Sequence, residues 1–243
     1  MVLFRWFNMK KILAIGNSFA DDSFEYLSRI DHDIIIGVLY IGGCSLKMHR
    51  DNLENNKSLY TYRKDVGYGL VSKDNVKMTE ALLDEKWDII TFQQASYDSG
   101  NLYSYNEDLD YLLLNVRKIV GEKVKFYWLM TWAYDVNSNH EGFKLYHNNQ
   151  QEMFESILKC VDLIKNKFFD ILYVGKIIQI ARENKITNLT RDSYHLSLDT
   201  GRFIASLYIY KKLINKNIDN VKYYPTSISN DEFIKIKELI KDN

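Results

Sequence analysis

The sequence predicts an α/β protein, built as a three-layer α/β/α sandwich around a mainly parallel five-stranded sheet. Two observations favour this class. Short runs rich in Ile, Val and Leu recur along the 243 residues, as expected for strands buried on both faces. Segments with helical spacing of apolar residues separate these runs. Because internal repeats and linker-like composition are lacking, we expect one domain over residues 1–243.

The first strand is expected at Lys11–Ile15, a short apolar run with β-branched residues. Gly16 and Asn17 then break it, since both residues tolerate the backbone angles of a tight turn. Ser18 follows at once, and Ser23–Ile30 is expected to form an amphipathic helix. A serine at such a turn lies at the carboxyl edge of a parallel sheet, where open α/β folds keep their sites.

The later elements follow the same alternation. Further strands are expected at residues 33–40, 87–92, 124–129 and 170–174. Helices are expected at 46–56, 79–85, 107–120, 149–165, 176–184 and 199–215, with a last one opening at Ser229. Residues 59–72 are expected to form a small hairpin laid over the main fold. A polar, aromatic loop is expected at 131–147.

The composition restricts the class of partner and the compartment. The chain carries 32 basic and 32 acidic residues, so no global field favours nucleic acid or an anionic membrane. It has no apolar stretch long enough to span a bilayer. Residues 1–8 are too short for a secretory signal, and Met9 is a candidate start. We therefore expect a cytoplasmic protein whose two cysteines, Cys44 and Cys160, are reduced and mostly buried.

Ser18 has two interpretations from its own surroundings. It can be a helix cap, which the stretch alone favours. It can also be a nucleophile, because backbone N–H groups at a helix start favour a developing negative charge. The second interpretation needs a base and an orienting acid elsewhere in the chain.

Asp192 and His195 can supply that pair. An acid three residues before a histidine can receive the Nδ1 proton and leave Nε2 free to act as a base. The alternative is a surface turn in which Asp192 caps the following helix. The segment follows the last strand and its helix, so it can return to the same edge of the sheet as Ser18.

Four blocks of the chain resemble those of the SGNH (GDSL-like) hydrolases, and more closely the DUF4886 branch of that superfamily. They are Gly16-Asn17-Ser18-Phe19, Ile41-Gly42-Gly43-Cys44-Ser45-Leu46, Phe92-Gln93-Gln94-Ala95-Ser96 and Leu189–Ser197, with Thr131-Trp132-Ala133-Tyr134 as a further likeness. The resemblance extends from Met9 to about Tyr210. It implies the flavodoxin-like SGNH hydrolase fold and an ester hydrolase without a metal or cofactor.

The resemblance also implies roles for single residues. Ser18 would be the nucleophile, His195 the general base and Asp192 its orienting acid. The backbone N–H groups of Ser18 and Gly43 would hold the oxyanion together with a side-chain amide. The third block usually ends in Gly-x-Asn-Asp, whose asparagine supplies that amide, whereas this chain has Gln93 and Gln94. We expect Gln94 to replace it, with Gln93 as the next candidate.

Several other side chains are candidates for binding. Trp132, Tyr134 and Tyr97 follow strands and could form a sugar-stacking wall, although core packing explains them about equally well. The remaining histidines have no metal-ligand spacing, so no metal site is expected. No glycine-rich nucleotide-binding loop is present.

These observations predict a serine esterase that removes a small acyl group through an acyl-enzyme. An acetyl group on a carbohydrate, and more generally a small-molecule or glycan ester, is the candidate substrate by analogy. Two alternatives stay open on the same fold, a non-catalytic carbohydrate-binding protein and an acyltransferase. The oligomeric state is open as well.

Overall fold

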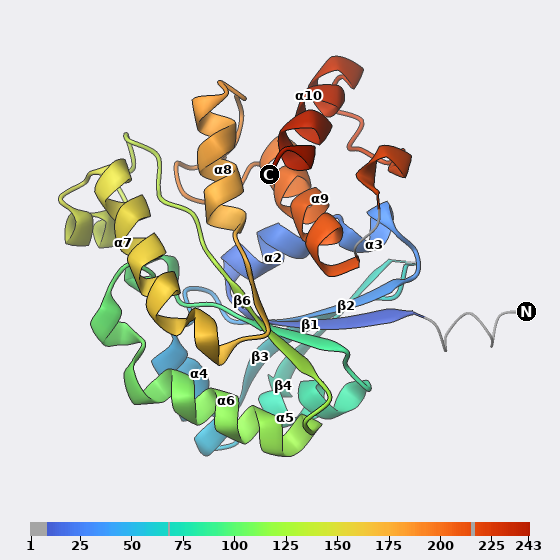
Figure 1. The fold of residues 1–243 in the computed structure, drawn as a ribbon. Coiled ribbons are helices and arrows are strands. Elements are labelled where there is room, and N and C mark those ends of the chain that lie inside the picture. Colours follow the sequence, from blue (N-terminus) through green and yellow to red (C-terminus); the bar gives the residue numbers. More distant parts are fainter. Residues whose placement is uncertain (1–8, 68, 215–216) are drawn as a thin grey trace, which may run out of the picture.

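A seven-stranded sheet forms the middle of this computed structural model, which describes residues 9–67, 69–214 and 217–243. The strand order is β4-β3-β2-β1-β5-β6-β7. Figure 1 shows the sheet lying between two groups of helices. The proposed extension before Met9, residues 1–8, lies outside the described residues.

Five of the strands are parallel, as the sequence predicts. They are β1 (Lys10–Gly16), β2 (Ile34–Tyr40), β5 (Ile89–Phe92), β6 (Lys125–Leu129) and β7 (Asp170–Leu172). The expectation of only five strands is wrong, because the hairpin is part of the sheet. Its strands β3 (Ser58–Asp65) and β4 (Leu70–Lys77) are antiparallel, and β3 pairs with the outer edge of β2 instead of lying over the fold. The hairpin thereby satisfies the backbone groups that β2 would otherwise leave unpaired.

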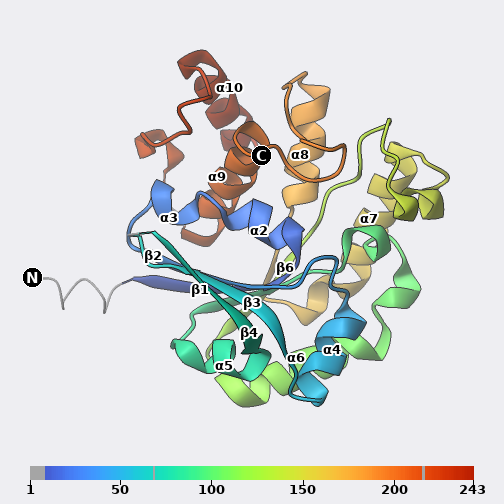
Figure 2. The same cartoon turned by 180° about the vertical axis from the view of Figure 1, so that it is seen from behind.

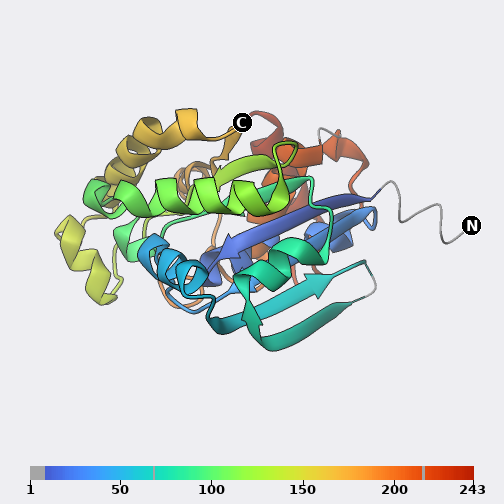
Figure 3. The ribbon, with the colours of Figure 1, turned by 90° about the horizontal axis from the view of Figure 1, so that it is seen from below.

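Helices cover both faces of the sheet, which confirms the three-layer architecture (Figure 2). One layer holds α2 (Ser18–Phe24), α3 (Leu27–Ile30), α8 (Val174–Glu183), α9 (Thr200–Ile214) and α10 (Asn230–Lys241). The other holds α4 (Leu46–Glu54), α5 (Met78–Asp84), α6 (Asn106–Val120) and α7 (Gln150–Ile164). Figure 3 shows the second layer lying across the strands. The expected loop at 131–147 includes a short 3-10 helix, η3 (Glu141–Tyr146).

The first helix differs from its expected range of 23–30. It begins five residues earlier, at Ser18, because the Asn17 side chain caps it by accepting the Phe19 N–H at 3.0 Å. The helical segment then breaks after Phe24, and Ser206 Oγ of α9 accepts the Tyr26 N–H at 3.1 Å. The break yields two short helices, both of which pack against α9.

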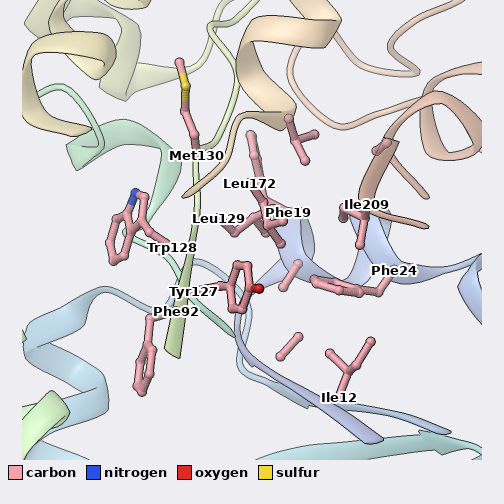
Figure 4. Packing of buried hydrophobic residues seen from close by; sticks show 14 of the residues in the cluster. Ile12, Phe19, Phe24, Phe92, Tyr127, Trp128, Leu129, Met130, Leu172 and Ile209 are labelled. Atoms are coloured by element: carbon pink, nitrogen blue, oxygen red, sulfur yellow. The ribbon is translucent and has the colours of Figure 1, made fainter. Parts of the chain in front are cut away.

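The hydrophobic core lies on both sides of β1. Ile12 and Leu13 alternate across the strand and neither is exposed, as the apolar run predicts. On the α2 side, Phe24 lies beside Ile209 of α9 (Figure 4). The Phe19 ring stacks on Trp132 with 4.2 Å between ring centroids. These contacts hold α2, and with it the residue that begins α2, against the end of β1.

The order of the strands places a switch point between β1 and β5. The chain proceeds outward from β1 to β2, then returns to the other side of β1 as β5 and continues to β6 and β7. Loops that follow the two strands at such a point diverge and leave a crevice where ligands bind in open α/β sheets. Ser18 follows β1 and Gln93 follows β5, so both lie at this position.

Cys44 and Cys160 are free and buried, as expected. Burial raises the pKa of the Cys44 thiol to about 12 and that of Cys160 to about 11, which keeps both thiols protonated and unreactive at neutral pH. Within the described ranges, none of the helices has the length and apolar character needed to cross a membrane.

Candidate active site

Ser18 is the first residue of α2, directly after the Gly16–Asn17 turn. Because Asn17 caps the helix through its side chain, the Ser18 N–H is one of the helix-start donors with no intrahelical acceptor. The Ser18 side chain is half-buried and lies at the carboxyl edge of β1. The turn therefore presents a hydroxyl and a backbone donor together.

The structure brings Ser18, His195 and Asp192 into one chain of hydrogen bonds. His195 Nε2 lies 2.8 Å from Ser18 Oγ, although the residues are 177 positions apart. His195 Nδ1 lies 2.7 Å from Asp192 Oδ2. A carboxylate only accepts, so Nδ1 carries the proton and Nε2 is left to accept the Ser18 O–H. This is the arrangement that a serine nucleophile with an oriented base requires.

Asp192 is fixed from both sides of its carboxylate. While Oδ2 receives the imidazole, Oδ1 accepts the backbone N–H of His195 at 2.8 Å and of Tyr194 at 3.3 Å. Burial raises the pKa of Asp192, but the hydrogen bonds and charge of His195 and the Tyr194 N–H outweigh burial and hold that pKa below its usual value. The turn depends on Ser193, whose φ is +72°.

The segment after β6 supports this turn, a role that sequence reasoning missed. The Trp132 indole N–H donates to the Tyr194 carbonyl at 2.6 Å, and the Asp135 N–H donates to the Ser193 carbonyl at 2.8 Å. Arg182 of α8 in turn holds Asp135 Oδ1 at 2.8 Å. An acid in a polar loop looks solvent-exposed in the sequence, and only the fold reveals these partners.

Gly43 lies on the loop after β2 in a left-handed conformation with φ of +62°, which favours glycine. A Cβ at this position would meet no atom within 4 Å, so its surroundings are open. Among the residues that the structure describes, none accepts a hydrogen bond from the Gly43 N–H. The loop is tied to the Ser18 turn through the next residue, since Asn17 Nδ2 donates to the Cys44 carbonyl at 3.1 Å.

The Gln94 side chain is committed to other loops. Its Nε2 donates to the Ser104 carbonyl at 2.8 Å and to Ser104 Oγ at 2.9 Å. Its Oε1 accepts the N–H groups of Leu46 at 3.0 Å and Ala95 at 2.8 Å. Both amide protons are taken, which contradicts the expectation that Gln94 donates to an oxyanion.

Gln93 is engaged as well. Its Nε2 donates to Asn17 Oδ1 at 2.7 Å and to the Gln94 carbonyl at 3.3 Å, and its amide lies against Gly16, where a Cβ would come within 2.8 Å of it. The glutamine side chain thus reaches Asn17, which caps the helix that begins at Ser18. Like Gln94, it has no free N–H in this arrangement, which argues against a direct role at the oxyanion.

Two of the three residues expected to form an aromatic wall lie in the core instead. Trp132 and Tyr134 are wholly buried, so their assignment to substrate binding is wrong. The Tyr134 hydroxyl is 2.8 Å from Ser96 Oγ in the interior. Tyr97 is half-buried, and its hydroxyl donates to the Gly43 carbonyl at 3.4 Å.

Two half-buried rings that the sequence did not single out, those of Tyr194 and His140, lie next to His195 or to each other. The Tyr194 ring is centred 4.3 Å from that of His195, and the His140 ring is 4.8 Å from Tyr194. His140 Nδ1 accepts the Gly142 N–H at 3.0 Å. Burial, followed by the charge of His195, lowers the pKa of His140, so its ring is neutral beside the site. Tyr97, Tyr194 and His140 are called the aromatic rim below.

The fold is that of solved structures described as SGNH hydrolases and acetylxylan esterases. The structure superimposes on a proposed SGNH hydrolase from Slackia heliotrinireducens with a TM-score of 0.57 at 18% identity, covering 82% of this chain and 96% of that one. An acetylxylan esterase from Geobacillus stearothermophilus, in a catalytic mutant form, matches with a TM-score of 0.52 at 13% identity, covering 84% and 93%. At these identities the likeness is one of fold.

The chain belongs to the DUF4886 family, a domain of unknown function whose model matches residues 11–239. A DUF4886 family protein from Bacteroides uniformis is 35% identical, with a TM-score of 0.92 over 96% of this chain and 94% of that one. A search of curated proteins finds no match to this chain.

Proposed function

We propose that this protein is a serine esterase that hydrolyses a small acyl ester through an acyl-enzyme. The observation that carries the proposal is the unbroken chain of hydrogen bonds from Ser18 through His195 to Asp192. A serine whose only role was to cap a helix would not require an imidazole hydrogen-bonded to its hydroxyl. It would also not require a carboxylate that orients this imidazole.

The geometry supports a two-step mechanism. Ser18 Oγ attacks the ester carbonyl carbon while its proton passes to His195 Nε2, and Asp192 stabilises the resulting imidazolium. When the tetrahedral intermediate collapses, His195 gives this proton to the departing alkoxide and the acyl group stays on Ser18. A water molecule then attacks the acyl-enzyme while its proton passes to His195 Nε2, and the imidazolium returns this proton to Ser18 Oγ as the acyl–oxygen bond breaks and the acid leaves.

The oxyanion in this mechanism is held by two backbone donors, the N–H groups of Ser18 and Gly43. Since the amides of Gln93 and Gln94 are engaged elsewhere, we assign no side chain to this task. One donor typically contributes about 10²–10³ in rate. We therefore expect a competent enzyme that is slower than one with three donors, with activated esters as its best test substrates.

For the substrate we propose an acetyl ester on a carbohydrate. The support is the aromatic rim, because half-buried rings beside a nucleophile offer flat apolar surfaces on which the C–H face of a sugar can stack. The acetylxylan esterase with the same fold is consistent with this choice.

Hydrolysis of p-nitrophenyl acetate and labelling with a fluorophosphonate test the esterase proposal. We expect turnover with burst kinetics, and a single adduct that peptide mass spectrometry locates on Ser18. A folded protein that binds oligosaccharides but gives neither turnover nor adduct would be a carbohydrate-binding protein instead. Acyl transfer to an added alcohol in preference to water would make it an acyltransferase.

Tyr97 tests the carbohydrate part separately. With an acetylated xylooligosaccharide, Tyr97→Ala is expected to raise KM about tenfold, because one aromatic stacking surface is lost. Tyr97→Phe is the matched control, since it keeps the ring and removes only the hydroxyl that contacts Gly43. Equal KM values for the two variants would contradict a stacking role.

A further inference from the structure

The Asp22 side chain lies at the junction of the nucleophile's helix and the loop that carries the base. Asp22 is four residues after Ser18, one turn along α2, and its side chain is completely buried. A buried carboxylate is costly unless charged or hydrogen-bonding groups surround it. The groups that contact the Asp22 carboxylate therefore indicate which parts of the structure it joins.

Those partners flank the Asp192–His195 turn on both sides. Before the turn, Arg191 places its guanidinium 3.1 and 3.0 Å from the two oxygens of Asp22. After the turn, the Leu196 N–H donates to Asp22 Oδ2 at 3.0 Å. Arg191 also donates to the Leu196 carbonyl. Arg191 and Leu196 thus hold the two ends of the turn together, and both residues are bound to Asp22 of α2.

Arg202 of α9 completes the electrostatic environment. Its Nε and a terminal nitrogen lie 2.8 and 2.7 Å from Asp22 Oδ1, and it also reaches Glu25 at 3.5 Å. Burial raises the pKa of Asp22, and the charges of Arg202 and Arg191 oppose that rise. With two guanidinium groups in contact, the ionised carboxylate is the form that satisfies every donor around it.

We propose that Asp22 is a positioning residue, which sets the distance between Ser18 Oγ and His195 Nε2 by anchoring the base-bearing turn to the nucleophile's own helix. Since one rigid helical turn carries both Ser18 and the anchor, a shift of α2 moves nucleophile and base together. The inference rests on the proposed roles of Ser18 and His195. It adds a residue that touches neither substrate nor triad side chains.

The test compares three variants, Asp22→Asn, Arg191→Gln and Asp21→Asn. Asp21→Asn is the matched control, because Asp21 lies next to Asp22 on α2 but pairs with Arg63 of β3, away from the turn. Arg191→Gln removes the guanidinium link between the turn and Asp22, so that only the Leu196 N–H still joins them, and it leaves the buried Asp22–Arg202 pair intact. It should therefore fold even if Asp22→Asn does not, and circular dichroism verifies the fold of each.

Two readouts are measured on each folded variant. The first is kcat with p-nitrophenyl acetate on the pH-independent plateau, which we expect to fall about 10–100-fold in Asp22→Asn and Arg191→Gln and less than twofold in Asp21→Asn. The second is the tautomer of His195 from imidazole ¹⁵N shifts, with His195→Gln used for assignment. We expect the Nδ1–H form in the native protein and in Asp21→Asn, and a mixture with the Nε2–H form in the other two.

The readouts separate this proposal from the proposed function. If the native protein lacks esterase activity but the tautomer shifts as expected, the anchor stands and the esterase assignment falls. If Arg191→Gln retains the native tautomer, or matches Asp21→Asn in kcat, the positioning role of Asp22 is overturned. Should Asp22→Asn not fold, the tautomer and kcat of Arg191→Gln decide between these outcomes by themselves.

Discussion

Ser18→Ala is expected to reduce the turnover of p-nitrophenyl acetate by about 10⁴-fold or more. The variant removes the only hydroxyl that contacts His195 Nε2 among the described residues, so no acyl-enzyme forms. The remaining rate would reflect only water attack assisted by His195 and the backbone donors. Initial rates under substrate saturation, together with intact-protein mass spectrometry for the acetyl adduct, measure both consequences.

Ser193→Ala is the appropriate control for this experiment. Ser193 belongs to the same turn as His195, but its hydroxyl donates only to the Asp192 carbonyl. Its left-handed backbone conformation disfavours serine and alanine alike, because both carry a Cβ. We expect it to retain turnover within a few-fold of the native protein. A Ser18→Ala variant that is as active as Ser193→Ala would remove the nucleophile from the proposed mechanism.

Asp192→Asn is expected to lower kcat about 10²–10⁴-fold at neutral pH while leaving KM nearly unchanged. An asparagine amide turned toward His195 donates to Nδ1, which moves the imidazole proton to Nε2, where it can no longer accept the Ser18 proton. We expect the fall in kcat to stay below the upper end of this range, because Asp192 is partly exposed and water can replace part of its contact with His195 Nδ1. A variant with native kcat would show that the imidazole needs no orienting acid.

The same substitution has a pH-dependent effect on stability whose sign follows from the lowered pKa of Asp192. Since the folded state favours the ionised carboxylate, this stabilisation is present above the unfolded-state pKa of about 3.9 and disappears as the pH falls through the folded-state value. Thermal unfolding of both proteins between pH 7 and pH 2 measures it. The native protein should have the higher Tm at neutral pH, and the difference should shrink in acid.

The elements that the sequence predicted well are those governed by local pattern. The run Lys11–Ile15 and the four later apolar runs all became parallel strands, because burial on both faces requires continuous apolar residues. The start of the first helix was misplaced, although the Asn17 side chain that caps it is a local feature. The place of the hairpin in the sheet was missed because strand pairing is a non-local choice.

In the candidate site, too, local features were predicted better than contacts between distant segments. The proximity of Ser18, Asp192 and His195 was expected from a strand-to-helix turn, a three-residue spacing and the family resemblance, and the structure brings the three side chains together. Gln94 was assigned wrongly because its amide meets Ser104, whose position no local pattern reveals. Trp132 was wrongly assigned to substrate binding for a related reason. The Phe19 ring that stacks on it and the Tyr194 carbonyl that accepts its indole N–H come from distant segments.

Asp22 was overlooked because an acid in a short polar stretch is usually a surface residue. Nothing near it in sequence signals burial, and Arg191 and Arg202 lie 169 and 180 positions away. Only the folded structure shows that Asp22 contacts these two arginines, which is the basis of its proposed positioning role.

The span between nucleophile and base also bears on how the molecule matures. Ser18 belongs to the first strand–helix unit, whereas His195 arrives only after the last parallel strand and its helix have been added. If Ser18 is the nucleophile that we propose, a nascent or partly refolded polypeptide carries an unactivated serine, and Ser18 becomes reactive only after the segment with His195 has folded into place. Regained labelling of that serine during refolding would report on completion of the tertiary structure, which spectroscopic recovery of helices alone does not.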